Sequence, residues 1–482
     1  MDCRLVAPPT VALDLISRMG RSVARPIAPL LSTSNLPNRG VIVLADRHSH
    51  RSAAGLCLAL VLLAGILSST GFAAQRETVD RDIAILQKVL KQHPNADLYY
   101  RLGDLYVQKG RQTGDITYFN LADSSLREAI NSSPQFEAAH RHLAFVLYSL
   151  HDFAGATLEA QQAIRLDSND SYAYGVLGDA QLETGQYDEC AVTYGKAVAI
   201  NGDLYTYSRR SGLETIRGAN DLAIADLKRA IELGVRAGEP AEAIAWAQVT
   251  LAQDYFLMGK LDDAGAEGAA ALRSDPGYHR AFAALGEVEA AQRKFQQSAD
   301  SYRRAIAVIP LPEYAAALAD VETKLGNQED ALQQRQLVEF IAKLNALNRV
   351  LYNRVLVDYY ADHDIEHQAA LDLATSEFKI RHDIYGQDAL AWALYRDGKA
   401  RAALPYAMAA LRFNTADARL YFHAGMINAR LGRSRQARAY LKRALEVNPH
   451  FQPILDDLAE HQYAILNNHQ PDQYAGGNFT SR

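Results

Sequence analysis

The sequence has few of the residues and motifs on which catalysis, disulfide bonding or metal binding usually depend. It contains three cysteines, Cys3, Cys57 and Cys190. Two of them precede the region that we expect to fold, and one remaining thiol can form neither an internal disulfide nor a zinc cluster. The chain also lacks the Gly-x-Ser-x-Gly, Gly-x-x-x-x-Gly-Lys-Ser/Thr and Gly-x-Gly-x-x-Gly motifs. We therefore expect a protein that is not an enzyme and that binds no cofactor.

An excess of positive charge is also missing. The 50 Lys and Arg residues are outnumbered by 56 Asp and Glu residues, for a net charge of −6. Because nucleic-acid proteins gain most of their affinity by neutralising phosphates, we expect no nucleic-acid partner. The hydrophobic fraction of 49% is too high for a disordered chain. A length of 482 residues exceeds what one compact core usually supports, so we expect several domains or a repeat array.

A single long apolar run occurs, and it lies near the N-terminus. Residues 47–74 combine Arg47 and Arg51, an apolar stretch and small residues at the end, which predicts a signal peptide. The uncharged part, 53–74, is also long enough to span a bilayer, so an uncleaved signal anchor is the alternative. Either way, we expect the downstream chain to be exported, to a periplasmic or extracellular location. Residues 1–46 are expected to be a disordered tail or an extension from a wrong start codon, with an organelle transit segment as the other option.

The rest of the chain repeats one pattern of large and small residues. Residues three or four apart share one face of a helix, and a proline ends a helix, so each copy predicts a pair of helices. Such a pair cannot bury its apolar face alone and must stack on its neighbours. The pattern is carried by Phe282, Leu285, Gly286, Tyr302, Ala305 and Pro310, by Tyr174, Leu177, Gly178, Tyr194 and Ala197, and by Tyr421, Ala424, Gly425, Ala437, Leu441, Ala444 and Pro449.

This pattern resembles that of the tetratricopeptide repeat (TPR) family, whose period is about 34 residues. Aligning the family pattern places repeat starts near positions 96, 137, 171, 205, 245, 279, 313, 351, 385 and 418. The resemblance, which is to an exported, bacterial-type member, implies an all-α fold: a right-handed α-solenoid of about ten stacked repeats. The expected parts are a capping half-repeat at 75–95, an N-terminal block at 96–244, a C-terminal block at 245–451, and a cap helix with a disordered tail at 452–482.

Two local features refine this register. The first repeat contains extra residues, "RQTGDITYFN", which we expect to lengthen the turn between its two helices. A glycine recurs where the first helix of a repeat should end, and a left-handed residue there would cap the helix. These glycines are Gly110, Gly185, Gly218, Gly259, Gly326, Gly398 and Gly432.

One stretch resembles a metal site. Residues 363–367 read His-x-x-Glu-His, like the inverted zincin motif, which would make a zinc-dependent hydrolase built on His363 and His367. That motif needs both histidines on one continuous helix. The repeat register instead places the intervening residues in a turn, so we expect no metal here. Cys190 falls at a small-residue position of a second helix and is expected to be packed in the core.

The resemblance also implies where a partner would bind, because the first helices of such repeats line the concave surface. The corresponding positions combine basic and aromatic side chains, which suggests a groove for an acidic or carboxylate-bearing extended peptide. The alternative is that these residues are a solvated face whose aromatic rings pack between helices. The predicted groove residues are Arg141, His142, Phe145, Tyr148, Arg209, Arg210, Arg217, Trp246, Gln253 and Phe256.

The resulting prediction is a non-enzymatic, exported scaffold whose concave groove binds a partner protein or extended peptide. A membrane-anchored envelope assembly factor is the alternative, with membrane contact only through residues 53–74 if they remain uncleaved. The carboxylate clamp that binds chaperone tails is not reproduced, because Asp104 and Val176 stand where that clamp has asparagine.

Overall fold

The computed structural model describes residues 78–347 and 353–468. All of them belong to one compact unit, Ile66–Arg482. The expected N-terminal tail, the signal segment and the C-terminal tail lie outside the described residues. Within the described part of the chain, no helix combines the length and the apolar character needed to cross a membrane.

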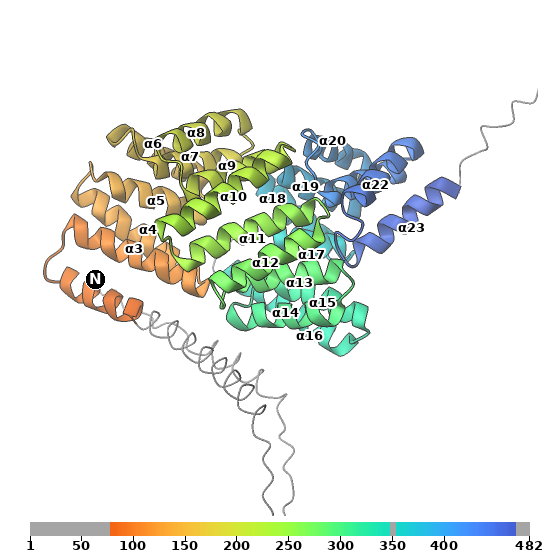
Figure 1. Ribbon diagram of the computed structural model, residues 1–482, viewed down its shortest axis with the longest axis horizontal. Coiled ribbons are helices and arrows are strands. Elements are labelled where there is room, and N and C mark those ends of the chain that lie inside the picture. Colours follow the sequence, from red (N-terminus) through yellow and green to blue (C-terminus); the bar gives the residue numbers. More distant parts are fainter. Residues whose placement is uncertain (1–77, 348–352, 469–482) are drawn as a thin grey trace, which may run out of the picture. The chain divides into compact units, whose positions relative to one another are not determined.

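The described residues form consecutive helices without strands, and each helix packs mainly on the next one (Figure 1). This arrangement confirms the expected all-α solenoid. The first helices of the repeats are α3 (Ala96–Thr113), α5 (Glu137–Ser149), α7 (Ser171–Glu183), α9 (Leu204–Ile216), α11 (Ala241–Leu257), α13 (His279–Ala291), α15 (Pro312–Leu325), α17 (Asn353–Asp362), α19 (Ile384–Arg396) and α21 (Ala418–Arg430). The second helices are α4 (Thr117–Ser132), α6 (Phe153–Leu166), α8 (Tyr187–Ile200), α10 (Asn220–Ala237), α12 (Leu261–Ser274), α14 (Phe295–Val308), α16 (Gln328–Leu347), α18 (His367–Phe378), α20 (Ala400–Ala410) and α22 (Ser434–Val447).

Additional helices cover both ends of the array. A helix at 78–90 packs Val79 and Ile83 against Leu102 and Tyr106 of α3, as the expected capping half-repeat would. At the other end, α23 (Leu455–Asn468) packs on α22. In the middle of the array, α10 ends at Ala237 and a short link leads to α11, which begins at Ala241.

Within a repeat, small residues let the two helices approach closely. In α13 and α14, a Cβ added at Gly286 would lie 3.0 Å from the ring of Tyr302, which fills the space beside the glycine. Ser298 stands where the family usually has alanine, and its hydroxyl donates a 2.6 Å hydrogen bond to the carbonyl of Gly286. The serine therefore fits this buried contact because it finds an acceptor across the helix pair.

Replacing Gly178 with alanine should lower the free energy of unfolding by about 1–3 kcal/mol. The added Cβ would lie 2.3 Å from Cε1 of Tyr194, whose ring is buried and whose hydroxyl donates to Asp179. Gly195, on α8 of the same repeat, has nothing within 4 Å of an added Cβ. There, alanine should raise stability by about 0.5–1 kcal/mol through helix propensity. Urea unfolding of both variants tests this, and equal stabilities would contradict the packing.

Two details of the predicted turns were wrong. The extra residues of the first repeat lengthen helix α3 instead of the turn, because α3 continues to Thr113 and only three residues separate it from α4. Gly110 accordingly lies inside α3, where an added Cβ would meet the ring of Phe119. The left-handed cap is Gly114, at φ 67°. The other recurring glycines do have positive φ, which confirms their capping role.

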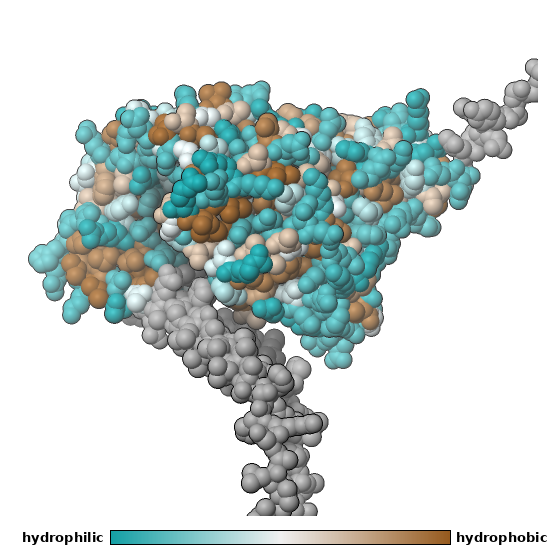
Figure 2. Space-filling model, viewed as in Figure 1, coloured by the Kyte–Doolittle hydropathy of each residue, from teal (hydrophilic) through white to brown (hydrophobic). Residues whose placement is uncertain are grey.

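The face shown in Figure 2 is mainly hydrophilic, with hydrophobic side chains gathered over α10 and α11. Exposed apolar residues occur on several second helices, including Leu158 on α6, Val192 on α8 and Leu222 on α10. Isolated exposed residues of this kind are ordinary on protein surfaces.

Candidate functional site

The inner part of the molecule is organised by contacts between repeats that are far apart in the sequence. The links that follow α7, α9 and α11 (184–186, 217–219 and 258–260) meet the links that follow α18, α20 and α22 (379–383, 411–417 and 448–454). We call this contact the seam. The backbone N–H of Ile384 donates to the hydroxyl of Tyr187 at 2.8 Å. The side chains of Thr415 and Asn448 donate to the carbonyls of Ile216 and Phe256, the latter at 3.0 Å.

Three glycines allow the seam to close. Gly185, Gly218 and Gly259 all have φ between 71° and 75°, a region that side chains disfavour. A Cβ added at Gly185 would lie 2.7 Å from the carbonyl oxygen of His382, and one at Gly259 would lie 2.4 Å from that of Val447. These glycines therefore serve two purposes, because they cap their helices and admit a second segment of backbone.

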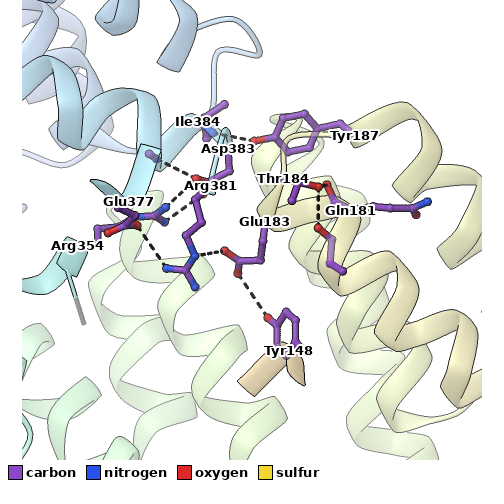
Figure 3. A network of polar contacts seen from close by, with 12 residues as sticks. Tyr148, Gln181, Glu183, Thr184, Tyr187, Arg354, Glu377, Arg381, Asp383 and Ile384 are labelled. Atoms are coloured by element: carbon purple, nitrogen blue, oxygen red, sulfur yellow. Dashed lines mark hydrogen bonds and ion pairs between the residues drawn. The ribbon is translucent and has the colours of Figure 1, made fainter. Parts of the chain in front are cut away.

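The seam also buries an ion-pair network and an apolar cluster. Arg381 contacts Glu183 of α7 at 3.0 Å, and Arg354 contacts Glu377 at 2.8 Å and Asp383 at 2.7 Å (Figure 3). Burial raises the pKa of Glu183, and the guanidinium of Arg381 opposes this effect. The apolar cluster joins side chains of α8 and α9 to those of α19 to α23, including Tyr187, Leu213, Ile216, Trp392, Leu420, Phe422 and Phe451. Hydrophobic burial and paired charges thus hold the two halves of the array together.

The structure gives the predicted groove arginines partners within the chain. Nε of Arg209 lies 2.9 Å from the carboxylate of Asp179, and Nε of Arg210 lies 2.6 Å from that of Asp226. Arg217 bonds Asp188 and the carbonyl of Tyr187. Arg141 lies 3.4 Å from Asp170. A carboxylate from a partner would therefore have to replace a carboxylate that these arginines already hold.

The remaining predicted groove residues have varied surroundings. His142 and Phe145 both contact the ring of Tyr172, while the hydroxyl of Tyr148 lies 3.4 Å from Glu183 at the seam. Trp246 packs partly buried in an apolar cluster of α11 and α13. Further along α11, Gln253 is exposed and Phe256 lines a cavity. The predicted residues therefore do not converge on one point.

That cavity, of about 310 Å³, was not predicted from the sequence. It lies among α11, α13, α15, α17 and the start of α21, and the link between α22 and α23 borders it. Its aromatic lining includes Phe256, Tyr302, Tyr359 and Phe451, and its charged lining consists of Glu287, Glu313, Asp320, Asp358, Asp362, Asp417, Arg419, His363 and His450. Acidic groups outnumber basic ones. Each repeat supplies only one or two of the acidic groups, so no local sequence motif predicts the site.

The histidines of the zincin-like stretch do not converge on a common point. His363 follows α17 and its Nε2 lies 2.7 Å from Asp320, whereas His367 begins α18 and contacts Asp364 at 3.0 Å. The predicted turn between the two helices is thus confirmed. Across the described residues, no group of three or more His, Cys, Asp or Glu side chains is arranged to hold a metal ion. Cys190 is buried, as predicted.

Asp254, next to the seam on α11, should make stability depend on pH. It is 6% exposed, its carboxylate accepts a 2.9 Å hydrogen bond from Thr215, and burial raises its pKa to about 7. Because an unfolded aspartate has a pKa of about 3.9, the folded state keeps a proton that the unfolded state has lost between those values. The contribution of Asp254 to stability therefore falls as pH rises from about 4 to about 7.

We expect Asp254→Asn to stabilise the protein more at about pH 8 than at about pH 5, by about 2–3 kcal/mol. Asparagine can keep the hydrogen bond from Thr215 and carries no charge. Urea unfolding at both pH values measures the effect, and Asp263→Asn, at an exposed position of α12, serves as the control. The same gain at both pH values would show that Asp254 is not held in its neutral form.

Comparisons with known proteins agree with the repeat register. Models of the tetratricopeptide repeat match residues 80–134, 171–204 and 418–451. The latter two ranges begin at the first residues of α7 and α21. No curated protein matches the chain significantly.

Solved structures that match include several TPR proteins. YrrB, described as a TPR protein with an unusual peptide-binding site, is 22% identical, with 38% of this chain and 92% of YrrB covered and a TM-score of 0.27. TTC0263, a thermophilic TPR protein of Thermus thermophilus, is 21% identical, with 45% and 100% covered and a TM-score of 0.34. Yeast Tom70 is 12% identical, with 84% and 96% covered and a TM-score of 0.36. The repeat motifs, the paired helices and the family-model matches together show that the chain is built from tetratricopeptide repeats, which supports a role as a protein-interaction scaffold.

Proposed function

We propose that this protein is a non-enzymatic scaffold that is exported across a membrane and binds a partner protein, or an extended segment of one, through the inner surface formed by its first helices. The observation that carries the proposal is the cavity that the first helices of several repeats line together. Since the seam fastens these repeats, the binding surface exists before the partner arrives and costs little to order. Proteins of this family are generally scaffolds without catalytic activity, which also supports the proposal.

The C-terminal part of the inner surface is the stronger candidate for the contact. Arg209 and Arg210 in the N-terminal repeats are already occupied by internal carboxylates. Gln253, by contrast, is exposed on α11 and precedes Phe256 and Leu257 of the cavity by about one helical turn. A partner that reached the cavity would therefore pass close to Gln253.

Site-specific photo-crosslinking in the native cell envelope tests the proposal. A photoreactive amino acid at position 253 should capture a partner, and one at Val192 on α8, an exposed position of a second helix, should not. Because both positions are exposed, neither substitution should disturb the fold. Identical sets of captured proteins at the two positions would refute binding through the inner surface.

The export step is tested separately by the mature N-terminus. A mature chain that begins near residue 75 indicates a cleaved signal peptide. A membrane-bound chain that retains residues 53–74 instead supports the anchored assembly factor, a reading that the uncharged length of this segment favours. An uncleaved chain found only in the cytosol would refute export.

A further inference from the structure

The cavity has a strong imbalance of charge. Six carboxylates line it, and Arg419 is its one guanidinium among the described residues. Arg419 lies 3.5 Å from Asp358 and 4.0 Å from Asp417, so it is shared between two of them. Asp320 pairs with His363; burial lowers the pKa of that histidine, but the carboxylate of Asp320 raises it above its usual value. The carboxylate of Asp362 accepts hydrogen bonds from the neutral side chains of Trp392 and Gln452. Glu287 has no hydrogen bond or ion pair with another described residue.

Buried acceptors without partners point into the same region. Oε2 of Glu313 and Oε1 of Gln452, both in the lining, are shielded from solvent and accept no hydrogen bond. Asp388, which is 5% exposed, has one carboxylate oxygen bonded to His423 and the other, Oδ1, without a partner. It lines a recess of about 200 Å³ that shares Asp358 and Arg419 with the main cavity.

A ligand that pairs with these oxygens would have to donate hydrogen bonds. A buried acceptor that stays unpaired costs about 1–3 kcal/mol, and the cost is higher for a charged group. Burial also raises the pKa of Glu287 to about 7, and the guanidinium of Arg419 opposes this shift only in part. A ligand that carries N–H donors and a positive charge would satisfy the acceptors and relieve this penalty.

We propose that this cavity holds a positively charged side chain of the partner, either the ammonium group of a lysine or the guanidinium group of an arginine. The aromatic rings of Tyr302, Tyr359 and Phe451 in the lining can contact the alkyl stem or the face of the cation. The inference rests on the proposed function, since it names the partner chemistry at the inner surface. It differs from the sequence-based expectation of an acidic peptide, which was based on arginines that the chain itself neutralises.

Isothermal titration of the purified chain tests the proposal with defined probes. These are a Gly/Ser peptide carrying lysine and arginine, the same peptide carrying glutamate instead, and the small amine agmatine. We expect the cationic peptide to bind and the acidic peptide not to bind. The double change Glu287→Gln and Glu313→Gln should weaken binding of the cationic peptide about tenfold or more, because both carboxylates face the cation.

The matched control removes the same charge elsewhere. Glu189→Gln with Glu460→Gln changes exposed glutamates of α8 and α23, outside the cavity, and should leave the affinity unchanged. Equal weakening by both double variants would show binding by general surface charge and would overturn the inference. Preference for the acidic peptide would overturn it as well, and so would tighter binding of agmatine than of the cationic peptide, which would indicate a free small amine as the occupant.

A measurement on the unmodified chain covers the case in which the cavity variant does not fold. A cationic peptide with a photoreactive group should crosslink to cavity residues such as Tyr302 or Tyr359, as located by mass spectrometry. Crosslinks only outside the cavity would overturn the inference. Capture of a partner at position 253 could still succeed in that event, so the proposed function and the cationic occupant fail independently.

Discussion

Replacing Gly259 with alanine is expected to lower the free energy of unfolding by about 3–5 kcal/mol, whereas the same change at Gly432 should cost about 1–2 kcal/mol. The two glycines have almost the same backbone conformation, with φ of 71° and 73°. A Cβ at position 259 would lie 2.4 Å from the carbonyl oxygen of Val447 across the seam, while one at position 432 would meet nothing within 4 Å. The difference between the variants therefore isolates the close approach of the two backbones.

Urea unfolding followed by circular dichroism measures this difference. Hydrogen exchange shows in addition which parts of the structure open. Faster exchange in links 184–186 and 379–383 of the Gly259→Ala variant would show that the seam opens as a unit. Equal losses at positions 259 and 432 would contradict the tight seam. They would leave the helix pairs of the solenoid unaffected.

The second large effect is expected at Arg354. Its guanidinium contacts Glu377 and Asp383, whose side chains are 9% and 7% exposed. Arg354→Leu leaves Asp383 buried without its cation and leaves Glu377 with Arg381 alone, at 3.5 Å. Breaking a buried pair in this way typically costs about 3–5 kcal/mol. The control is Arg229→Leu on α10, because Arg229 and its partner Glu232 are about half exposed and such pairs contribute about 1 kcal/mol or less.

The comparison of these two arginine variants by thermal and urea unfolding tests whether the network is structural. A loss of stability at Arg354 as small as that at Arg229 would indicate that water reaches the buried carboxylates. In that case the ion pairs of Figure 3 would not hold the seam together.

The repeat pattern predicted the helix pairs because the contacts that define them are local. Gly286 and Tyr302 meet within one repeat, so a fixed spacing in the sequence reports their packing. The same reasoning failed for Gly110, because an extended α3 moved the cap to Gly114. A glycine marks a possible cap, but the length of the helix before it decides whether it becomes one.

The seam could not be predicted from the same pattern. Gly185 and Gly398 occupy equivalent turns and have nearly equal φ, yet only Gly185 lies against distant backbone. Whether the two sets of links meet depends on the small rotation between each repeat and the next, added over many repeats. No single residue determines this total rotation. The groove prediction failed to anticipate internal partners for a related reason, because Asp179 reaches Arg209 from the neighbouring repeat.

The seam has a consequence for how ligands come and go. An open solenoid can change its pitch to fit a target. In this solenoid, the hydrogen bonds of Tyr187 with Ile384 and of Phe256 with Asn448 hold the pitch fixed. The partner segment that we propose would then have to enter the interior by one end or wait until the seam opens. The residence time of a bound partner should therefore increase with the stability of the seam. Mutations in the seam, far from the bound molecule, should change its dissociation rate.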